Sequence, residues 1–284
     1  MIKTFAVTGA NGYLGGALCK FLKERDCNVI LLQRTKDNKE TVKKSVFFSL
    51  EDLPNPEVFK NVDVLVHCAY DPIPVSWKEI NTINIQGSIQ LFEAAQIGGV
   101  KQIIYISSIS AFDNCKSLYG QAKLTIEKEV AKIGGAIIRP GLIFGGNFGG
   151  FLASLKLFAG RFPLVPLIGR GDQVLYFSHV EDLCELIFNL GSNLKVVRSE
   201  PIPAACEKGQ TFKETLIALA RQEGKFPLLF PVPWKIIWLS LKILEWAQIR
   251  VGFRSDSVIS LVHQNARPDF SLLKEISSSF RSFD

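Results

Sequence analysis

The chain has 284 residues, of which 47% are hydrophobic, and a formal net charge of +6 from 33 basic and 27 acidic side chains. This content is enough for one large α/β domain and a smaller lobe, and the scattered basic residues argue against a nucleic-acid-binding protein. No run of 18 uncharged apolar residues predicts a membrane-spanning helix, and no basic region precedes the first strand to indicate a signal peptide. The six cysteines form no CxxC pair, so we expect reduced thiols, no metal site and a cytoplasmic protein.

A glycine-rich stretch from Thr8 to Gly16 follows the first predicted strand, residues 2–7, and the apolar residues after it recur at helical spacing. The glycines at 9, 12 and 15 fall at intervals of three, which differs from the G-x-G-x-x-G spacing of the dinucleotide fingerprint. A glycine turn that opens a helix presents backbone N–H groups and partial positive charge to an anion. We therefore expect a pyrophosphate-bearing cofactor here, with an ordinary strand–helix turn as the alternative.

The first half of the chain alternates apolar strands with helical periods, which is typical of an α/β fold with a Rossmann-type doubly wound parallel sheet. The predicted strands are 2–7, 28–33, 46–49, 62–68, 102–107 and 136–139, and the clearest helices are 83–95 and 119–131. From Gly141 onwards glycine pairs and prolines become frequent, which indicates a smaller, mixed lobe over the carboxyl ends of the strands. We predict a cofactor-binding domain over 1–145 with about 174–195, and a substrate-binding lobe over 146–173 and 196–284.

Tyr119 and Lys123 are four residues apart, so a helix places both on one face. A neighbouring ammonium favours the phenolate and lowers a tyrosine pKa that is about 10 when unperturbed. A tyrosine tuned in this way exchanges a proton with a carbinol or a carbonyl near neutral pH. The same spacing is common on amphipathic helices, but here it follows a strand that ends at Ser107 and Ser108.

Several ordered motifs resemble those of the extended short-chain dehydrogenases/reductases, the family of NAD(P)-dependent epimerases, dehydratases and reductases. Before the Tyr-x-x-x-Lys pair, the matching stretches are Thr8-Gly-x-x-Gly-x-x-Gly15, Val66-His67-Cys68-Ala69, Asn84-Ile85-Gln86-Gly87 and Ser108-Ile109-Ser110-Ala111-Phe112. After the pair, residues 139–145 and 178–183 match two later signatures. The resemblance is dense over the first two thirds of the chain, and it implies a Rossmann fold and an enzyme that uses a nicotinamide cofactor.

By this resemblance Tyr119 is the general acid/base, and Lys123 lowers its pKa and holds the nicotinamide ribose. Ser108 hydrogen-bonds the reacting oxygen, with Ser107 as its rival. The resemblance also implies a set of cofactor-binding residues: Thr8, Gly9, Asn11, Gly12, Tyr13, Leu14, Gly15, Arg34, Leu50, His67, Cys68, Ala69, Tyr119, Lys123 and Pro140. Two further polar residues of the motifs, Asn84 and His179, are expected to be mainly structural.

Arg34 follows the second predicted strand, where an NAD-specific relative would carry an acidic residue for the ribose 2′-OH. An arginine there accommodates a 2′-phosphate, so we expect NADP as the cofactor, with NAD as the alternative. The competing interpretation of Arg34 is a solvated loop cation. Ser49 also departs from the family pattern, because many relatives hold an aspartate there, near the adenine.

Other departures narrow the function. Ile109 and Ser110 replace the Asp-Glu pair of the 4,6-dehydratases, so dehydration is not expected. Leu142 and Leu175 stand where sugar-nucleotide enzymes often carry a substrate asparagine and a diphosphate-binding arginine. Four other arginines could bind a substrate diphosphate instead, namely Arg161, Arg170, Arg254 and Arg267.

These features predict an NAD(P)-dependent oxidoreductase or epimerase of a nucleotide-activated sugar, acting by 4-keto reduction or epimerisation. Segments 253–257 and 264–269 resemble C-terminal parts of bacterial epimerase/dehydratase-type proteins associated with surface-polysaccharide synthesis, so we expect that role. The two leucines leave open an NADPH reductase of a hydrophobic carbonyl substrate, and a non-catalytic NADP-binding scaffold is the third interpretation. The expected ligand is a nucleotide- or lipid-linked sugar, and a homodimer remains open.

The segment Val232–Gln248 predicts an unusually apolar helix that begins near Pro233. One face carries Trp234, Ile237, Trp238, Leu241 and Leu244, and the apolar arc is widened by Ile236, Leu239, Ile243 and Trp246. Such an arc needs a cover, which the small lobe or a dimer interface could provide. The other interpretation places the helix at the inner face of a membrane, with its lysines toward water, which would suit a lipid-linked sugar.

Overall fold

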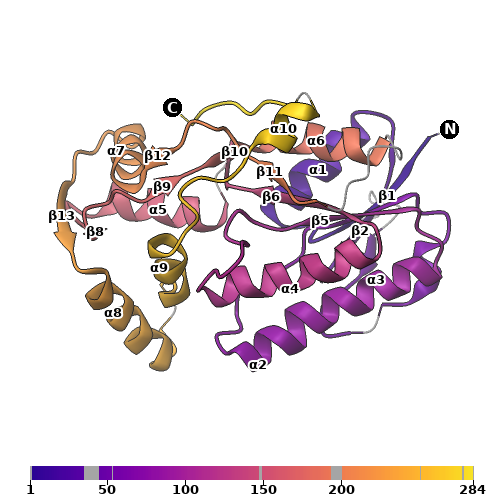
Figure 1. The fold of residues 1–284 in the computed structure, drawn as a ribbon, viewed down its shortest axis with the longest axis horizontal. Helices are drawn as coiled ribbons and strands as arrows, with labels where there is room; N and C mark the ends of the chain where they lie inside the picture. Colours follow the sequence, from indigo (N-terminus) through magenta and orange to yellow (C-terminus); the bar gives the residue numbers. More distant parts are fainter. Residues whose placement is uncertain are drawn as a thin grey trace.

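A seven-stranded parallel sheet lies at the centre of the fold (Figure 1). The computed structural model describes residues 2–34, 45–52, 54–146, 149–192, 200–249, 251–276 and 278–283. The strand order is β11-β6-β5-β4-β1-β2-β3, and neighbouring strands run parallel. The strands are β1 (Thr4–Thr8), β2 (Asn28–Gln33), β3 (Ser45–Phe47), β4 (Val64–His67), β5 (Gln102–Ile106), β6 (Ala136–Pro140) and β11 (Ile202–Ala204). The predicted Rossmann-type sheet is confirmed. The structure adds the edge strand β11, which the sequence did not predict because proline is rare in strands away from sheet edges.

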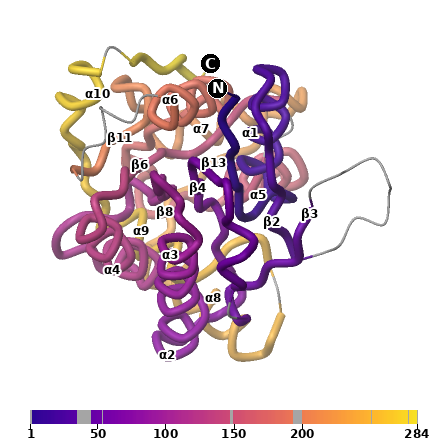
Figure 2. The backbone as a smooth tube through the Cα atoms, turned by 90° about the vertical axis from the view of Figure 1, so that its right-hand side faces the viewer, coloured from indigo at the N-terminus to yellow at the C-terminus, as the bar shows by residue number. Residues whose placement is uncertain are grey.

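Helices cover both faces of the sheet, because alternate residues of each strand point to opposite sides. In β1, Phe5 and Val7 belong to one core cluster and Ala6 to the other. The first cluster packs under α1 (Tyr13–Lys23) and α6 (Val180–Ser192), and the second under α3 (Gly87–Ile97) and α4 (Leu118–Lys132). Figure 2 shows these two pairs on opposite sides of the strands. The short elements of this part are η1 (Pro56–Phe59), α2 (Trp77–Ile80), the π-helix η2 (Asn81–Gln86) and α10 (Ser271–Glu275).

The smaller lobe has a core of its own, built around four helices and short strands. Its helices are α5 (Gly150–Arg161), α7 (Phe212–Gln222), α8 (Trp234–Trp246) and α9 (Ser255–Val262). Its strand pairs are β8 (Leu164–Ile168) with β13 (Leu228–Val232), β9 (Val174–Leu175) with β12 (Gln210–Thr211), and β7 (Leu142–Phe144) with β10 (Phe177–His179). The lobe core also takes in Leu175 and Phe177, which our predicted boundaries assigned to the larger domain.

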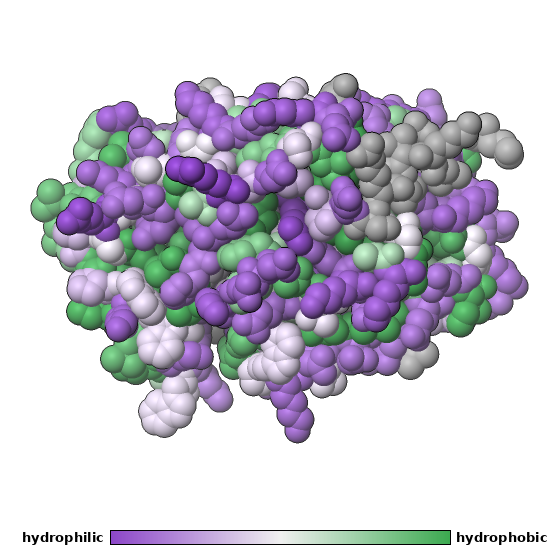
Figure 3. All heavy atoms as spheres, viewed as in Figure 1, coloured by the Kyte–Doolittle hydropathy of each residue, from purple (hydrophilic) through white to green (hydrophobic). Residues whose placement is uncertain are grey.

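The predicted apolar helix corresponds to α8, which begins directly after Pro233 and packs on α9. The face that we predicted to be inward is half-buried against the lobe core and includes Trp234, Ile237, Trp238 and Leu241. The residues that widen the apolar arc are exposed, namely Ile236, Leu239, Ile243 and Trp246. Figure 3 shows apolar side chains at the surface on the side of the molecule that carries β13 and α8. None of the described helices is long and apolar enough to cross a membrane.

Candidate active site

The glycine-rich loop joins β1 to α1 and has the shape of an anion cradle. Gly9 has a positive φ of 64°, and the Gly12 N–H donates to the Gly9 carbonyl at 2.8 Å. A Cβ on Gly15 would lie 2.2 Å from the Gly9 oxygen, so only glycine allows the loop to fold back on the helix. No side chain caps α1 and no acidic residue lies in its first turn. Asn11 and Gly12 are exposed, which leaves the helix N-terminus accessible to a phosphate group.

A buried hydrogen-bond chain ties this loop to β4. The Thr8 hydroxyl accepts from the N–H groups of Cys68 and Ala69, both at 3.1 Å, and therefore donates its own hydrogen to His67 Nδ1 at 2.7 Å. His67 Nε2 lies 2.9 Å from Ser88 Oγ, and Ser88 in turn donates to the Asn84 carbonyl. Burial lowers the pKa of His67 to about 3, so the ring is neutral and carries its hydrogen on Nε2.

This chain shows where the side chains of several predicted cofactor-binding residues lie. The side chains of Thr8 and His67 are both 0% exposed, so they hold the strand ends together instead of facing a ligand. Leu14 and Leu50 also point into the two core clusters, and only their backbone atoms remain for a cofactor. Gly87 shows why the Asn-x-x-Gly motif carries glycine, because a Cβ there would lie 2.2 Å from the Leu50 carbonyl oxygen.

The carboxyl ends of β1, β4, β5 and β6 meet along one edge of the sheet, where parallel register brings Thr8 opposite His67. Cys68 and Ala69 follow β4 at this edge, and the Ala69 backbone lies 3.2 Å from a Cβ built on Gly9. Pro140 ends β6, and its carbonyl accepts from Ile109 N–H at 3.0 Å. The predicted residues of the loop and of the strand ends therefore lie together.

Arg34 lies just beyond β2 at the same edge, with its side chain 67% exposed. Its Nη1 is 3.8 Å from Asp71 Oδ2, a pair that exposure and distance make weak. Asn84 holds the backbone of Asp71, accepting from its N–H at 2.7 Å and donating to its carbonyl at 3.0 Å. Asn84 thus ties loops together, as we expected. The guanidinium of Arg34 is free enough to turn from this carboxylate to a phosphate.

Tyr119 lies in the first turn of α4, which is held from two sides. The Ser117 hydroxyl caps the helix by accepting from Gly120 N–H at 3.1 Å. The Asp256 carboxylate, from the start of α9, accepts from the N–H groups of Leu118 and Tyr119 at 2.8 and 3.0 Å. A hydrogen bond with Ser108 lowers the pKa of Tyr119, but burial outweighs it and raises that pKa to about 12. The phenol is therefore protonated at neutral pH.

Lys123 lies one turn further along α4, with only 3% of its surface exposed. Its Nζ donates to the Ile106 carbonyl at 2.8 Å and lies 5.1 and 5.8 Å from the ring centres of Tyr70 and Tyr119. Burial lowers the pKa of Lys123 to about 8. The expected lowering of the tyrosine pKa by Lys123 is not found, because burial of the phenol dominates and the lysine hydrogen-bonds the end of β5.

The rivalry between the two serines is decided by a buried ion pair. Ser107 Oγ donates to Glu127 Oε1 at 2.5 Å, and Arg139 donates to both oxygens of the same carboxylate at 2.8 and 2.6 Å. The Ser107 hydroxyl is therefore engaged in a hydrogen bond with this ion pair, inside the protein and below the site. Ser108 is half-buried beside Tyr119, and its hydroxyl accepts from Ser110 N–H at 3.1 Å.

Two residues of this site were missed by sequence reasoning. Tyr70 packs its ring edge-on to Tyr119, with centres 5.0 Å apart, yet it follows the matched motif in an irregular loop. Asp256 reaches the catalytic helix from 137 residues away, so no local pattern connects them. Tyr13 is also more than a loop residue, because its hydroxyl donates to the Gly145 carbonyl and links the glycine loop to the small lobe.

The residues present fit a nicotinamide dinucleotide. The cradle that a Cβ would fill and the uncapped start of α1 suit the pyrophosphate of a dinucleotide. Tyr119, Ser108 and Lys123 lie at the carboxyl edge of the same sheet. Among the described residues, no group of three or more His, Cys, Asp or Glu side chains is placed to hold a metal ion.

The chain is similar in sequence to known proteins. The UPF0659 protein YMR090W of Saccharomyces cerevisiae is 30% identical over 204 residues, which cover 64% of this chain and 84% of that protein. An uncharacterized oxidoreductase of Staphylococcus epidermidis is 24% identical over 179 residues, or 50% of this chain and 78% of the relative.

The fold is also similar to that of solved epimerases. MoeE5 in complex with UDP-glucose and NAD aligns with a TM-score of 0.75 and 19% identity, over 99% of this chain and 94% of that one. The UDP-glucose 4-epimerase of Thermus thermophilus in complex with NAD aligns with a TM-score of 0.65 and 20% identity, over 91% and 97%. The model of the NAD dependent epimerase/dehydratase family matches residues 5–199. The chain belongs to this family and is an enzyme that uses a nicotinamide cofactor.

Proposed function

We propose that the protein is an NADP-preferring oxidoreductase or epimerase that acts on a nucleotide-activated sugar, by 4-keto reduction or epimerisation, in surface-polysaccharide synthesis. The observation that carries this proposal is the convergence of Ser108, Tyr119 and Lys123 on the sheet edge that also holds the glycine cradle. The nucleotide-sugar epimerases among the similar structures support the substrate class.

A bound nicotinamide supplies or accepts the hydride, and the protein's own residues handle the proton. The phenol of Tyr119 donates its proton to the carbonyl oxygen of the substrate as that carbon is reduced. Ser108 orients the phenol and hydrogen-bonds the same oxygen, and Lys123, charged below a pKa of about 8, would hold the ribose of the nicotinamide. Burial keeps this phenol protonated at neutral pH, so the proton that a carbonyl reduction needs is present on Tyr119.

The NADP preference rests on Arg34. A guanidinium pairs with a 2′-phosphate through charge-assisted hydrogen bonds, which are stronger than its exposed pair with Asp71 at 3.8 Å. Reductase and epimerase differ in stoichiometry, because a reductase consumes one NADPH per product and an epimerase regenerates its cofactor. We favour the reductase, since Leu142 removes a polar anchor common in UDP-sugar epimerases.

The test is a panel of 4-keto and 4-hydroxy nucleotide sugars, with NADPH absorbance and product analysis followed together. Equimolar NADPH loss and product support the reductase. Product without net NADPH loss would reverse that choice, and no reaction with any nucleotide sugar would overturn the substrate class.

An NADPH reductase of a hydrophobic ketone or aldehyde is the second candidate. Leu175 is buried in the lobe core and Leu142, in β7, packs against the same core, so neither position offers a polar group to a sugar nucleotide. Aliphatic ketones and aldehydes in the same absorbance assay separate this candidate from the first.

For location and assembly we propose a cytoplasmic protein that touches the inner face of a membrane through 232–248, or that forms a homodimer through the same segment. Trp246 is 87% exposed, and Ile236, Leu239 and Ile243 are bare beside it. The same helix carries Lys235 and Lys242, which would attract an anionic surface. Liposome flotation and sedimentation velocity separate the two arrangements.

A further inference from the structure

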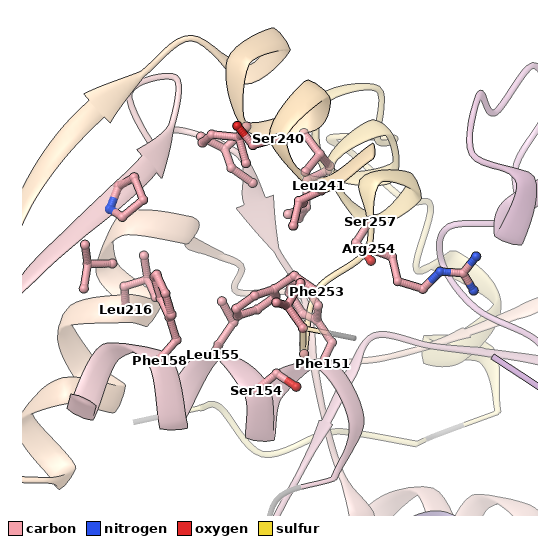
Figure 4. A pocket seen from close by; sticks show the side chains of 18 of the residues that line it. Phe151, Ser154, Leu155, Phe158, Leu216, Ser240, Leu241, Phe253, Arg254 and Ser257 are labelled. Atoms are coloured by element: carbon pink, nitrogen blue, oxygen red, sulfur yellow. The ribbon is translucent and has the colours of Figure 1, made fainter. Parts of the chain in front are cut away.

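A cavity of about 650 Å³ lies in the small lobe, away from the polar groups of the catalytic residues (Figure 4). Its floor is α5, with Phe151, Leu155 and Phe158, and its opposite wall is α8, with Ile237 and Leu241. Side chains from α7, α9, β8, β13 and the segment 251–254 complete the lining. These elements come from separate parts of the chain, so this space exists only in the folded lobe.

The lining is almost entirely apolar. Of its 25 residues, five are polar or charged: Ser154, Arg161, Ser240, Arg254 and Ser257. The hydroxyls of Ser154 and Ser240 donate to carbonyls of their own helices, those of Gly150 and Ile236. A sugar or a nucleotide would lose its hydrogen bonds to water there and find few in return, and ordered water needs more polar partners than these walls offer. The cavity is suited to hydrocarbon.

The mouth of the cavity is rimmed by exposed apolar side chains. Leu157 and Phe162 at the end of α5, Ile236 of α8 and Val251 all belong to the lining, and all four are exposed. Bare apolar side chains at the entrance to an apolar cavity are typical of a site for a long, flexible ligand. Arg161 lies on this rim and gives it a positive charge.

Helix α9 is a wall that the cavity shares with the catalytic residues. Val258 and Leu261 face the cavity, while Ser260 donates to Ser110 at 3.1 Å and Asp256 holds the N–H of Tyr119. A helix with its side chains is about 10 Å across, so a ligand in the cavity lies about one helix diameter from the catalytic loop.

Arg254, directly before α9, belongs to the lining of the cavity, and its guanidinium points away from it and donates to the carbonyls of Pro72 and Pro74. Asp256, two residues further on, accepts from the N–H of Tyr119. The wall of the cavity and the support of the catalytic tyrosine are therefore neighbours in the chain.

We propose that this cavity binds the aliphatic chain of an amphiphilic substrate, whose polar, carbonyl-bearing end is the part that Tyr119 reduces. The proposal rests on the second candidate function, the NADPH reductase of a hydrophobic carbonyl, and deepens it by naming an amphiphile as the substrate. Each buried methylene strengthens binding about fourfold, so affinity rises with chain length until the cavity is full.

The test uses the full chain and a dansyl-labelled undecanoic acid, titrated by fluorescence. Ser240→Trp places an indole in the cavity from α8, where Figure 4 shows Ser240 at its edge, and should raise the dissociation constant about tenfold or more. The matched control is Leu239→Trp, an exposed neighbour outside the lining, which should stay within about twofold of wild type. Unchanged NADPH binding shows that both variants are folded.

Displacement of the probe by alkyl phosphates of increasing length gives the second measurement. The proposal is supported if the dissociation constant of the alkyl phosphate falls about fourfold per added methylene and then levels off. If bilayer vesicles displace the probe as effectively as single-chain phosphates do, the cavity binds membrane lipid and the proposal is overturned. The proposal also fails if the probe does not bind to wild type, or if Ser240→Trp and Leu239→Trp lose probe affinity equally. If the probe binds as expected but no substrate consumes NADPH, the proposed function fails while the chain site stands.

Discussion

The carboxyl edge of the sheet and the outer side of the small lobe use buried and exposed surface in opposite ways. At the edge, polar groups are buried and paired, as in the chain from Thr8 through His67 to Ser88. In the lobe, apolar groups are exposed, and α8 has no buried residue at all. Burying a polar group without a partner costs free energy, so the paired groups hold the geometry of the sheet edge fixed. Exposed apolar side chains are stabilised only when another surface covers them. The sheet edge therefore suits a reaction site, and the outer side of the lobe suits the binding of a ligand or a partner.

The largest effect is expected from removing the proposed acid at the sheet edge, Tyr119. We expect Tyr119→Phe to lower turnover by about 10²–10⁴ on the best substrate of the panel, because a positioned acid is worth that much. NADPH binding should hardly change, since the phenol hydroxyl is the only group removed. Tyr176→Phe is the control, as that hydroxyl donates at 2.8 Å to the Ala266 carbonyl in another part of the fold. Full activity in Tyr119→Phe would show that the acid is elsewhere.

The buried edge also predicts a pH dependence. Burial lowers the pKa of His67 to about 3, against 6.5 when unperturbed, so between these values the unfolded chain binds a proton that the folded chain does not. The free energy of unfolding should therefore fall as pH drops from about 6.5 toward 3, by up to about 1.4 kcal/mol per pH unit from this residue. Urea titrations at several pH values measure it.

Other groups titrate in the same range, so the informative quantity is a difference between variants. His67→Gln should be less stable than wild type at neutral pH but lose less stability on acidification. His263→Gln, at an exposed position on the lobe, should leave the wild-type profile unchanged. Parallel profiles for wild type and His67→Gln would mean that His67 is charged in the folded protein.

Substitutions of exposed residues that border the sheet edge, such as Arg34, should have smaller effects. We expect wild type to bind NADPH about ten- to hundredfold more tightly than NADH, because the 2′-phosphate pairs with Arg34 for about 1.5–3 kcal/mol. Arg34→Ala should abolish that preference in a fluorescence titration, whereas Arg170→Ala, an exposed arginine of the lobe, should keep it. Equal affinity of wild type for both cofactors would leave Arg34 as a solvated cation.

The smallest effect should come from a single residue of the apolar face. Trp246→Glu removes an indole that is 87% exposed and adds a negative charge, so it should weaken flotation with anionic liposomes several-fold at low salt. Ile97→Glu, which alters an exposed apolar residue of the large domain, is the control and should float like wild type. Trp238 is a poorer target than Trp246, because it packs on the lobe core. Wild type that stays soluble at low salt would rule out the membrane contact.

Local sequence determined much of this fold. Apolar runs predicted the strands of the parallel sheet, because alternate residues of a strand point to opposite faces of the sheet. Glycine spacing predicted the cradle, because glycine readily adopts the positive φ that such a turn requires. Helical periodicity likewise predicted the apolar helix α8 and grouped Trp234 and Leu241 on one face, which the structure packs on the lobe core. Tyr119 and Lys123 could be paired from spacing alone, since one helical turn joins them.

Long-range packing decided the rest. Ser107 and Ser108 are adjacent and alike in sequence, and only Glu127 and Arg139 on neighbouring elements assign the first to structure. The tyrosine pKa rises where spacing predicted a fall, because burial depends on everything packed around the phenol. Asp256 and the cavity join segments that lie far apart in the chain, and no local pattern records which distant surfaces meet.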